Sequence, residues 1–91
     1  MGYSLEIDII RLSGTTDEYG QLWVGAPNIE LDKVTYIDCL TSTFSRSIAP
    51  YGIINLESIE NDGLKFRLIA TNNSTFNNYS IDKNVFVVYK Y

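Results

Sequence analysis

The sequence predicts an all-β fold, a small antiparallel β-sandwich or barrel of about six short strands, in a single domain over residues 1–91. Two observations carry this prediction. Short runs of alternating apolar and polar residues recur along the chain, with turn-forming residues between them. Asp62-Gly63 stands between two of these runs, which is typical of a tight β-hairpin. We therefore place a hairpin over residues 52–71 at the centre of the fold.

The register of this hairpin is predicted from the pattern of its two strands. A two-residue loop at Asp62-Gly63 would mix apolar and charged side chains on both faces of the hairpin. A three-residue loop over residues 61–63 separates them, and Gly63 would supply the left-handed conformation that such a loop needs. We predict the three-residue loop. The cross-strand pairs that it implies are Leu56–Leu68, Ile54–Ala70, Ser58–Phe66, Glu57–Arg67 and Ile59–Lys65.

The N-terminal run, residues 3–12, predicts a half-buried strand whose apolar side starts with Tyr3, Leu5, Ile7 and Ile9. The alternation changes phase after Ile9, because Ile10 and Leu12 then occupy the apolar positions. A β-bulge, or burial of both faces, would explain this change. Residues 13–20 are rich in turn formers and predict a loop.

The middle of the chain is less regular. Residues 21–25 predict a short strand that carries Trp23 and ends before Pro27. Residues 28–44 fit a helix by the spacing of their apolar residues, with Asn28 as a possible cap. The β-branched and aromatic residues at 34–37 favour a strand, so we expect a strand there and keep the helix as the alternative. Residues 44–51 predict an edge strand or a loop, interrupted by Pro50.

The C-terminal third predicts a long loop and a last strand. Residues 72–84 are polar and rich in asparagine, with Phe76, Tyr79 and Ile81 as apolar anchors. Residues 85–91 are apolar on both faces of a strand. This pattern indicates a central strand, or a strand that is covered by something outside the domain.

Composition and charge exclude several classes of function. The net charge of −4, with seven scattered Lys and Arg residues, argues against a nucleic-acid partner. No apolar run approaches the length of a membrane span, and the N-terminus lacks the pattern of a secretory signal. A single cysteine, Cys39, cannot form an internal disulfide. We therefore expect a cytoplasmic protein with no membrane span.

The chain is poor in residues that carry catalysis. It contains no histidine, which is the commonest general base. Cys39 has only Asp38 beside it and is expected to be buried and inert. Glycine loops for phosphate, calcium-loop spacing and CxxC motifs are absent. We expect neither an enzyme nor a cofactor or metal site. The carboxylate pairs expected on solvent-facing positions are Glu6/Asp8, Asp17/Glu18, Glu30/Asp32 and Glu57/Glu60.

Aromatic residues are the strongest candidates for contacts. The chain has seven tyrosines and one tryptophan, residue types that are favoured in interfaces. Tyr3, Trp23 and Tyr36 are expected to pack on the sheets, whereas aromatics in loops and at the C-terminal end are free for binding. The candidate interface residues are Tyr19, Tyr51, Phe76, Tyr79, Tyr89 and Tyr91.

These observations favour a non-catalytic structural or protein-interaction module that binds a protein partner or itself. Compact β domains of this kind occur among virus and phage accessory and virion subunits, and among inhibitors of other proteins, although this is an association only. One alternative is a carbohydrate- or ligand-binding β-sandwich that uses Trp23 and loop tyrosines. A second is a small carboxylate-based enzyme. A mass measured under native conditions and a glycan array would separate these classes.

Overall fold

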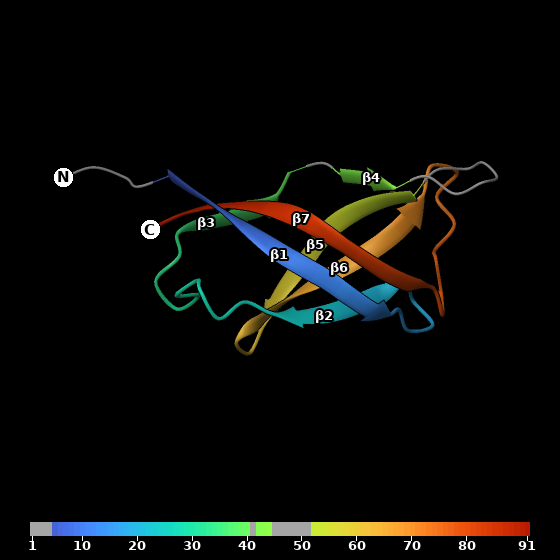
Figure 1. Cartoon of the computed structure of the whole chain (residues 1–91), viewed down its shortest axis with the longest axis horizontal. Helices are drawn as coiled ribbons and strands as arrows, with labels where there is room; N and C mark the ends of the chain where they lie inside the picture. The colour runs from blue at the N-terminus through green and yellow to red at the C-terminus, as the bar shows by residue number, and fades with distance from the viewer. Residues whose placement is uncertain (1–4, 41, 45–51) are drawn as a thin grey trace.

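Two antiparallel β-sheets pack face to face in the computed structural model, which describes residues 5–40, 42–44 and 52–91 (Figure 1). One sheet has the strand order β1-β7-β3 and the other has the order β2-β6-β5-β4. The prediction of an all-β fold is confirmed, and the sheets form an open sandwich rather than a closed barrel. The strands are β1 (Leu5–Thr15), β2 (Gln21–Gly25), β3 (Tyr36–Cys39), β4 (Ser42–Phe44), β5 (Gly52–Glu60), β6 (Gly63–Ala70) and β7 (Ser80–Lys90).

The described residues between β2 and β5 form turns and strands and not the alternative helix. Residues 27–33 make turns, and β3 and β4 follow them. The prediction of a strand within residues 28–44 is therefore confirmed. The predicted edge strand or loop at 44–51 lies outside the described residues after Phe44.

β1 and β7 form the longest pairing of the molecule. Their register runs without a shift from Leu5 opposite Lys90 to Thr15 opposite Ser80. β3 pairs with the other side of β7, so the last strand is central in its sheet, as one of the two predicted arrangements required. The predicted loop at 13–20 is wrong in its start, because β1 continues to Thr15.

The predicted orientation of β1 is wrong. Ile10 is buried, whereas the neighbouring Ile9 is 55% exposed. The strand has one uninterrupted alternation without the proposed bulge, so its even-numbered side chains face the other sheet. Figure 1 shows the first residues of β1 extending past the β5–β6 hairpin, where the other sheet no longer covers them. At this end of β1, Glu6 and Asp8 can therefore lie on the inner side of the sheet, while Ile7 and Ile9 lie on its outer side.

The core lies between the inner faces of the two sheets. β6 contributes Leu64, Phe66 and Leu68, all fully buried, because every second residue of this strand is apolar. Removing such side chains from water is the main favourable term in folding, worth about 1.5–3 kcal/mol each. Ile54 of β5 lies beside them in the same sheet, and the facing side chains from the other sheet are Ile10, Leu12, Val85 and Val87.

The hairpin of β5 and β6 is present, but its predicted register is wrong. The loop contains two residues, Asn61 and Asp62, and Glu60 lies opposite Gly63. Asn61 has φ of 56°, which fits the positive φ that tight hairpin turns need at their first central position. Asparagine tolerates this conformation, and Gly63 is therefore not needed to supply it.

A β-bulge at Glu57 reconciles the short loop with an apolar inner face. The register shifts between Leu56, which lies opposite Phe66, and Ser58, which lies opposite Lys65. Ile59 consequently turns inward and Ser58 outward, the reverse of the prediction. Ile54 lies opposite Leu68, so the predicted pairs were wrong although these side chains do share the inner face. The remaining predicted contact is present, since Arg67 Nη1 is 3.8 Å from Glu57 Oε1.

Hydrogen bonds of Thr16 connect the segment before β7 to the end of β1. Its side chain is buried, and its hydroxyl donates to the carbonyl of Phe76 and accepts from the N–H of Tyr79 at 2.8 Å. Its own N–H donates to the carbonyl of Tyr79 at 2.9 Å. Phe76 and Tyr79 meet edge to face with ring centroids 5.2 Å apart, so they anchor this loop as predicted. The predicted extent of the loop, residues 72–84, is wrong at its end, because β7 begins at Ser80 and includes Ile81.

Candidate interaction surface

The outer face of the three-stranded sheet exposes an unusual amount of apolar surface. Six of the ten large apolar side chains that are exposed in the described part of the chain belong to it. Leu5 is 68% exposed and Ile7 is 61% exposed. We call this surface the open face. Its apolar residues are Leu5, Ile7 and Ile9 of β1, Tyr36 of β3, Leu40 just after β3, and Phe86 with the half-buried Val88 of β7.

Strand register makes these side chains neighbours. Ile9 lies opposite Phe86, and Ile7 lies opposite Val88. Side chains that are directly opposite in an antiparallel pair have Cβ atoms about 4.5–5.5 Å apart. Leu40 continues the alternation of β3, and its N–H donates to the carbonyl of Phe86 at 2.9 Å, which extends the row of Ile9 and Phe86 across the sheet. The open face is therefore one continuous patch.

Charged groups on the open face lie around the apolar patch. Arg11 Nε donates to Asp82 Oδ1 at 2.6 Å on the side of the patch toward the C-terminal end of β1. At the opposite end, Lys90 Nζ lies 5.9 Å from the centre of the Tyr36 ring. Asp38 is the remaining charged residue of this face; it lies on the edge strand β3, directly opposite Val88. The rest of the middle of the patch, on β1 and β7, carries no charge.

The outer face of the four-stranded sheet has the opposite character. Lys65 Nζ is 2.5 Å from Glu60 Oε2. The exposed Trp23 is held there, because its indole N–H donates to the carbonyl of Glu60 at 2.8 Å and its ring lies against Gly63. Lys65 and Trp23 on this face thus each have a polar partner, as is normal for a surface in contact with water.

The side toward which the backbone groups of each strand point follows from one hydrogen bond. The carbonyl of Phe86 accepts from Leu40, so the backbone groups of Phe86 point toward β3. Backbone groups alternate sides along a strand, and those of Val87 therefore point toward β1 and its partner Asp8. The next residue of β1, Ile9, consequently points its N–H away from β7, toward the free edge of the sheet.

Aspartate side chains occupy donors on both free edges of this sheet. The N–H of Ile9 donates to Asp8 Oδ1 at 2.9 Å. On the other edge, the N–H of Cys39 donates to Asp38 Oδ1 at 2.8 Å. A charged group that takes up an edge donor disfavours the addition of another strand there. The open face, rather than an edge, is therefore the surface best suited for contact.

The structure separates the loop aromatics that the sequence proposed for the interface. Tyr19 is exposed, but it lies in the turn between β1 and β2 and not on the open face. Tyr51 lies outside the described residues. Phe76 is buried in the core and Tyr79 is half-buried against it. Tyr19, Phe76 and Tyr79 therefore do not form one surface with the open face.

The two C-terminal tyrosines pack on each other. Tyr89 is buried on the inner side of β7, and burial raises the pKa of its phenol, with a further contribution from Tyr91. Tyr91 lies edge to face with it at 5.6 Å, and its hydroxyl accepts from the N–H of Glu30 at 3.3 Å. This packing gives both aromatic rings a structural role at the C-terminal end of β7.

Sequence reasoning missed the aliphatic residues that make up most of the open face. Two signals were present in the chain. The phase change after Ile9 marks the point where the outward apolar run ends and the inward one begins. The apolar content of both faces of residues 85–91 reflects a core on one side and the open face on the other.

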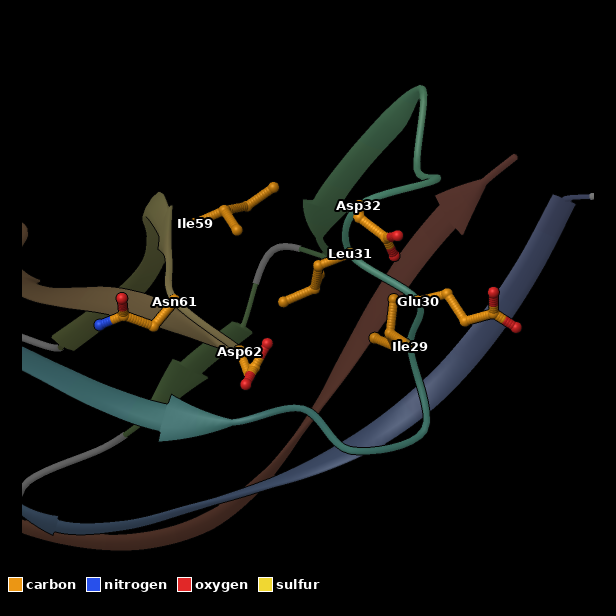
Figure 2. A pocket seen from close by; sticks show the side chains of 7 residues that line it. All are labelled: Ile29, Glu30, Leu31, Asp32, Ile59, Asn61 and Asp62. Carbon is orange, nitrogen blue, oxygen red and sulfur yellow. The ribbon is translucent and has the colours of Figure 1, made fainter.

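A hollow of about 600 Å³ lies between the β5–β6 turn and the segment after β2. Figure 2 shows Glu30 extending away from Asp62, so the carboxylates on its wall do not converge. Glu30 is also paired with Lys33, with Nζ and Oε2 2.9 Å apart. No group of metal-ligating side chains occurs among the described residues. The hollow is lined by Ile29, Glu30, Leu31, Asp32, Ile59, Asn61 and Asp62.

The candidate nucleophile is poorly placed for chemistry. Cys39 is half-buried, and its thiol lies 3.7 Å from the carbonyl of Ile54. Burial, with a smaller contribution from Asp38, raises the pKa of this thiol, so the reactive thiolate is disfavoured.

The Glu6/Asp8 pair faces inward near the open end of the sandwich, and not outward as predicted. Asp8 Oδ2 is buried without a hydrogen-bond donor in the described part of the chain.

Searches against protein-family models, curated proteins and solved structures found no match to this chain. The described residues contain no helix of the length and hydrophobicity needed to cross a membrane. Function therefore has to be argued from the surface itself.

Proposed function

We propose that this protein is a non-catalytic interaction module that binds another protein surface through the open face. The observation that carries the proposal is the concentration of exposed apolar side chains on β1, β3 and β7. Their exposed fractions correspond to about 600 Å² of apolar surface, which is at the upper end of what monomeric proteins expose in one patch. A patch of this size, rimmed by polar residues, is typical of a protein-binding site.

The arrangement of charge supports the same proposal. Interfaces are depleted of charge at their centre and polar at their rim. On β1 and β7 the open face has Ile7, Phe86 and Val88 at its centre, while Arg11 and Lys90 lie toward its ends. Asp38 is the one charged residue beside this centre, on the edge strand β3 opposite Val88. One backbone donor on each edge strand is occupied by an aspartate, which favours contact through side chains of the face.

Photo-cross-linking tests this proposal. A photoreactive phenylalanine analogue would replace Phe86 on the open face, and, as a control, Asn55 on the outer face of the other sheet. In cells of the organism that encodes the protein, position 86 is expected to give adducts of defined mass and position 55 none. An absence of defined adducts at position 86, or equal adducts at both positions, would refute the proposal.

A further inference from the structure

We propose that the partner of the open face is the same face of a second copy of this chain, so that the protein forms a two-fold symmetric dimer. This inference rests on the proposed function and adds the identity of the partner. Three properties of the three-stranded sheet support it: the area of the open face, its charge, and the hydrogen bonding of the sheet edges.

The area of the open face fits one standard interface. A stable protein–protein contact uses about 800 Å² from each partner. The exposed apolar side chains supply about 600 Å² of this, and Val88 with the polar rim lies in the same surface. A face-to-face dimer therefore needs no residues from outside the three-stranded sheet. Two β-sheets stack well in this way, about 10 Å apart, as they do inside a sandwich.

The charge of the open face allows two copies to approach. The chain as a whole has a net charge of −4, so most surfaces of two copies repel each other. On the open face, Arg11 and Lys90 balance Asp38 and Asp82, and the local net charge is zero. A basic or acidic partner would gain nothing from such a surface, whereas an identical neutral apolar face is complementary to it. Symmetric contacts of one patch with itself are the commonest form of oligomer.

The edges of the three-stranded sheet are less suited to binding a second copy than its open face. Dimers of β proteins also form by pairing of edge strands, which needs free backbone donors. On β1 the donor of Ile9 is occupied by Asp8, and on β3 the donor of Cys39 is occupied by Asp38. An added strand would have to displace these carboxylates, and two copies of β1 would bring the acidic Glu6 and Asp8 close to their equivalents.

Sedimentation equilibrium of the wild-type chain and of two variants tests the dimer. The wild-type protein is expected to shift from one to two chain masses as its concentration rises through the micromolar range. Ile7→Lys, which places a charge in the centre of the interface, is expected to weaken association by at least about 100-fold. Ile59→Lys is the matched control, because Ile59 is also an exposed isoleucine but lies off the open face. It should associate like the wild type.

The outcomes separate this inference from the proposed function. The dimer proposal would be overturned if the wild-type chain kept the mass of one chain up to a protein concentration of about 1 mM. Equal association of the wild type and Ile7→Lys would overturn it as well. In either case, defined adducts at position 86 with a mass other than two chains would leave the proposed function standing with a different partner. Circular dichroism of Ile7→Lys must show wild-type folding, and Ile9→Lys provides a second open-face variant if it does not.

Discussion

Replacing Ile10 with alanine is expected to lower the free energy of unfolding by about 2–5 kcal/mol, whereas the same change at Ile9 should cost less than about 1 kcal/mol. The two residues are neighbours of the same type. Ile10 is 5% exposed in the core between the sheets, and Ile9 is 55% exposed on the open face. Truncation of Ile10 leaves a cavity between the sheets, but truncation of Ile9 removes a side chain that already contacts water.

Urea unfolding of both variants measures this difference. The experiment belongs at a low protein concentration, because association through the open face would itself stabilise the folded state. A larger loss at Ile9 than at Ile10 would mean that β1 presents its odd-numbered residues to the core and that the open face does not exist.

Replacing Gly63 with alanine is expected to cost about 1–3 kcal/mol. A methyl group at this position would overlap the ring of Trp23 and lie 2.5 Å from the carbonyl oxygen of Val24. The ring is held by its hydrogen bond to the carbonyl of Glu60, and the second contact is backbone, so neither can move away easily. Gly63 is therefore needed for the close approach of the Trp23 ring and not for a left-handed turn.

The matched variant for this prediction is Asn61→Gly. Asn61 has positive φ, which glycine adopts without steric cost, so this change should leave the midpoint of urea unfolding nearly unaltered or raise it. If Gly63→Ala unfolds at the wild-type midpoint, the packing of Trp23 on the hairpin is not as described.

The hairpin shows what the sequence could and could not predict. The alternation of residues 52–71 correctly placed a hairpin there and put Ile54, Leu56 and Leu68 on its inner face. It did not reveal the bulge at Glu57, because a bulge changes the register without changing the composition of either strand. The short loop and the bulge together give nearly the same inner face as the three-residue loop. Pattern alone could not separate them.

The open face was missed for a different physical reason. Alternation identifies a strand but not which side of it the other sheet covers. In β1 the apolar stripe at 5–9 and the stripe formed by Ile10 and Leu12 lie on opposite sides, and only the position of the second sheet decides which is core. Aromatic residues attracted the prediction of an interface, yet Phe76 and Tyr89 serve the core. The candidate surface is mainly aliphatic.

Solvent accessibility of the isoleucine methyl groups tests the central claim most directly. A soluble gadolinium chelate accelerates the relaxation of methyl protons that water can reach. In dilute protein, the methyl groups of Ile7 and Ile9 are expected to relax rapidly and that of Ile10 slowly. At high protein concentration, Ile7 and Ile9 should become protected as a partner copy covers them. Methyl groups of Ile7 and Ile9 that are protected even in the most dilute sample, or that are equally accessible at every concentration, would contradict the account.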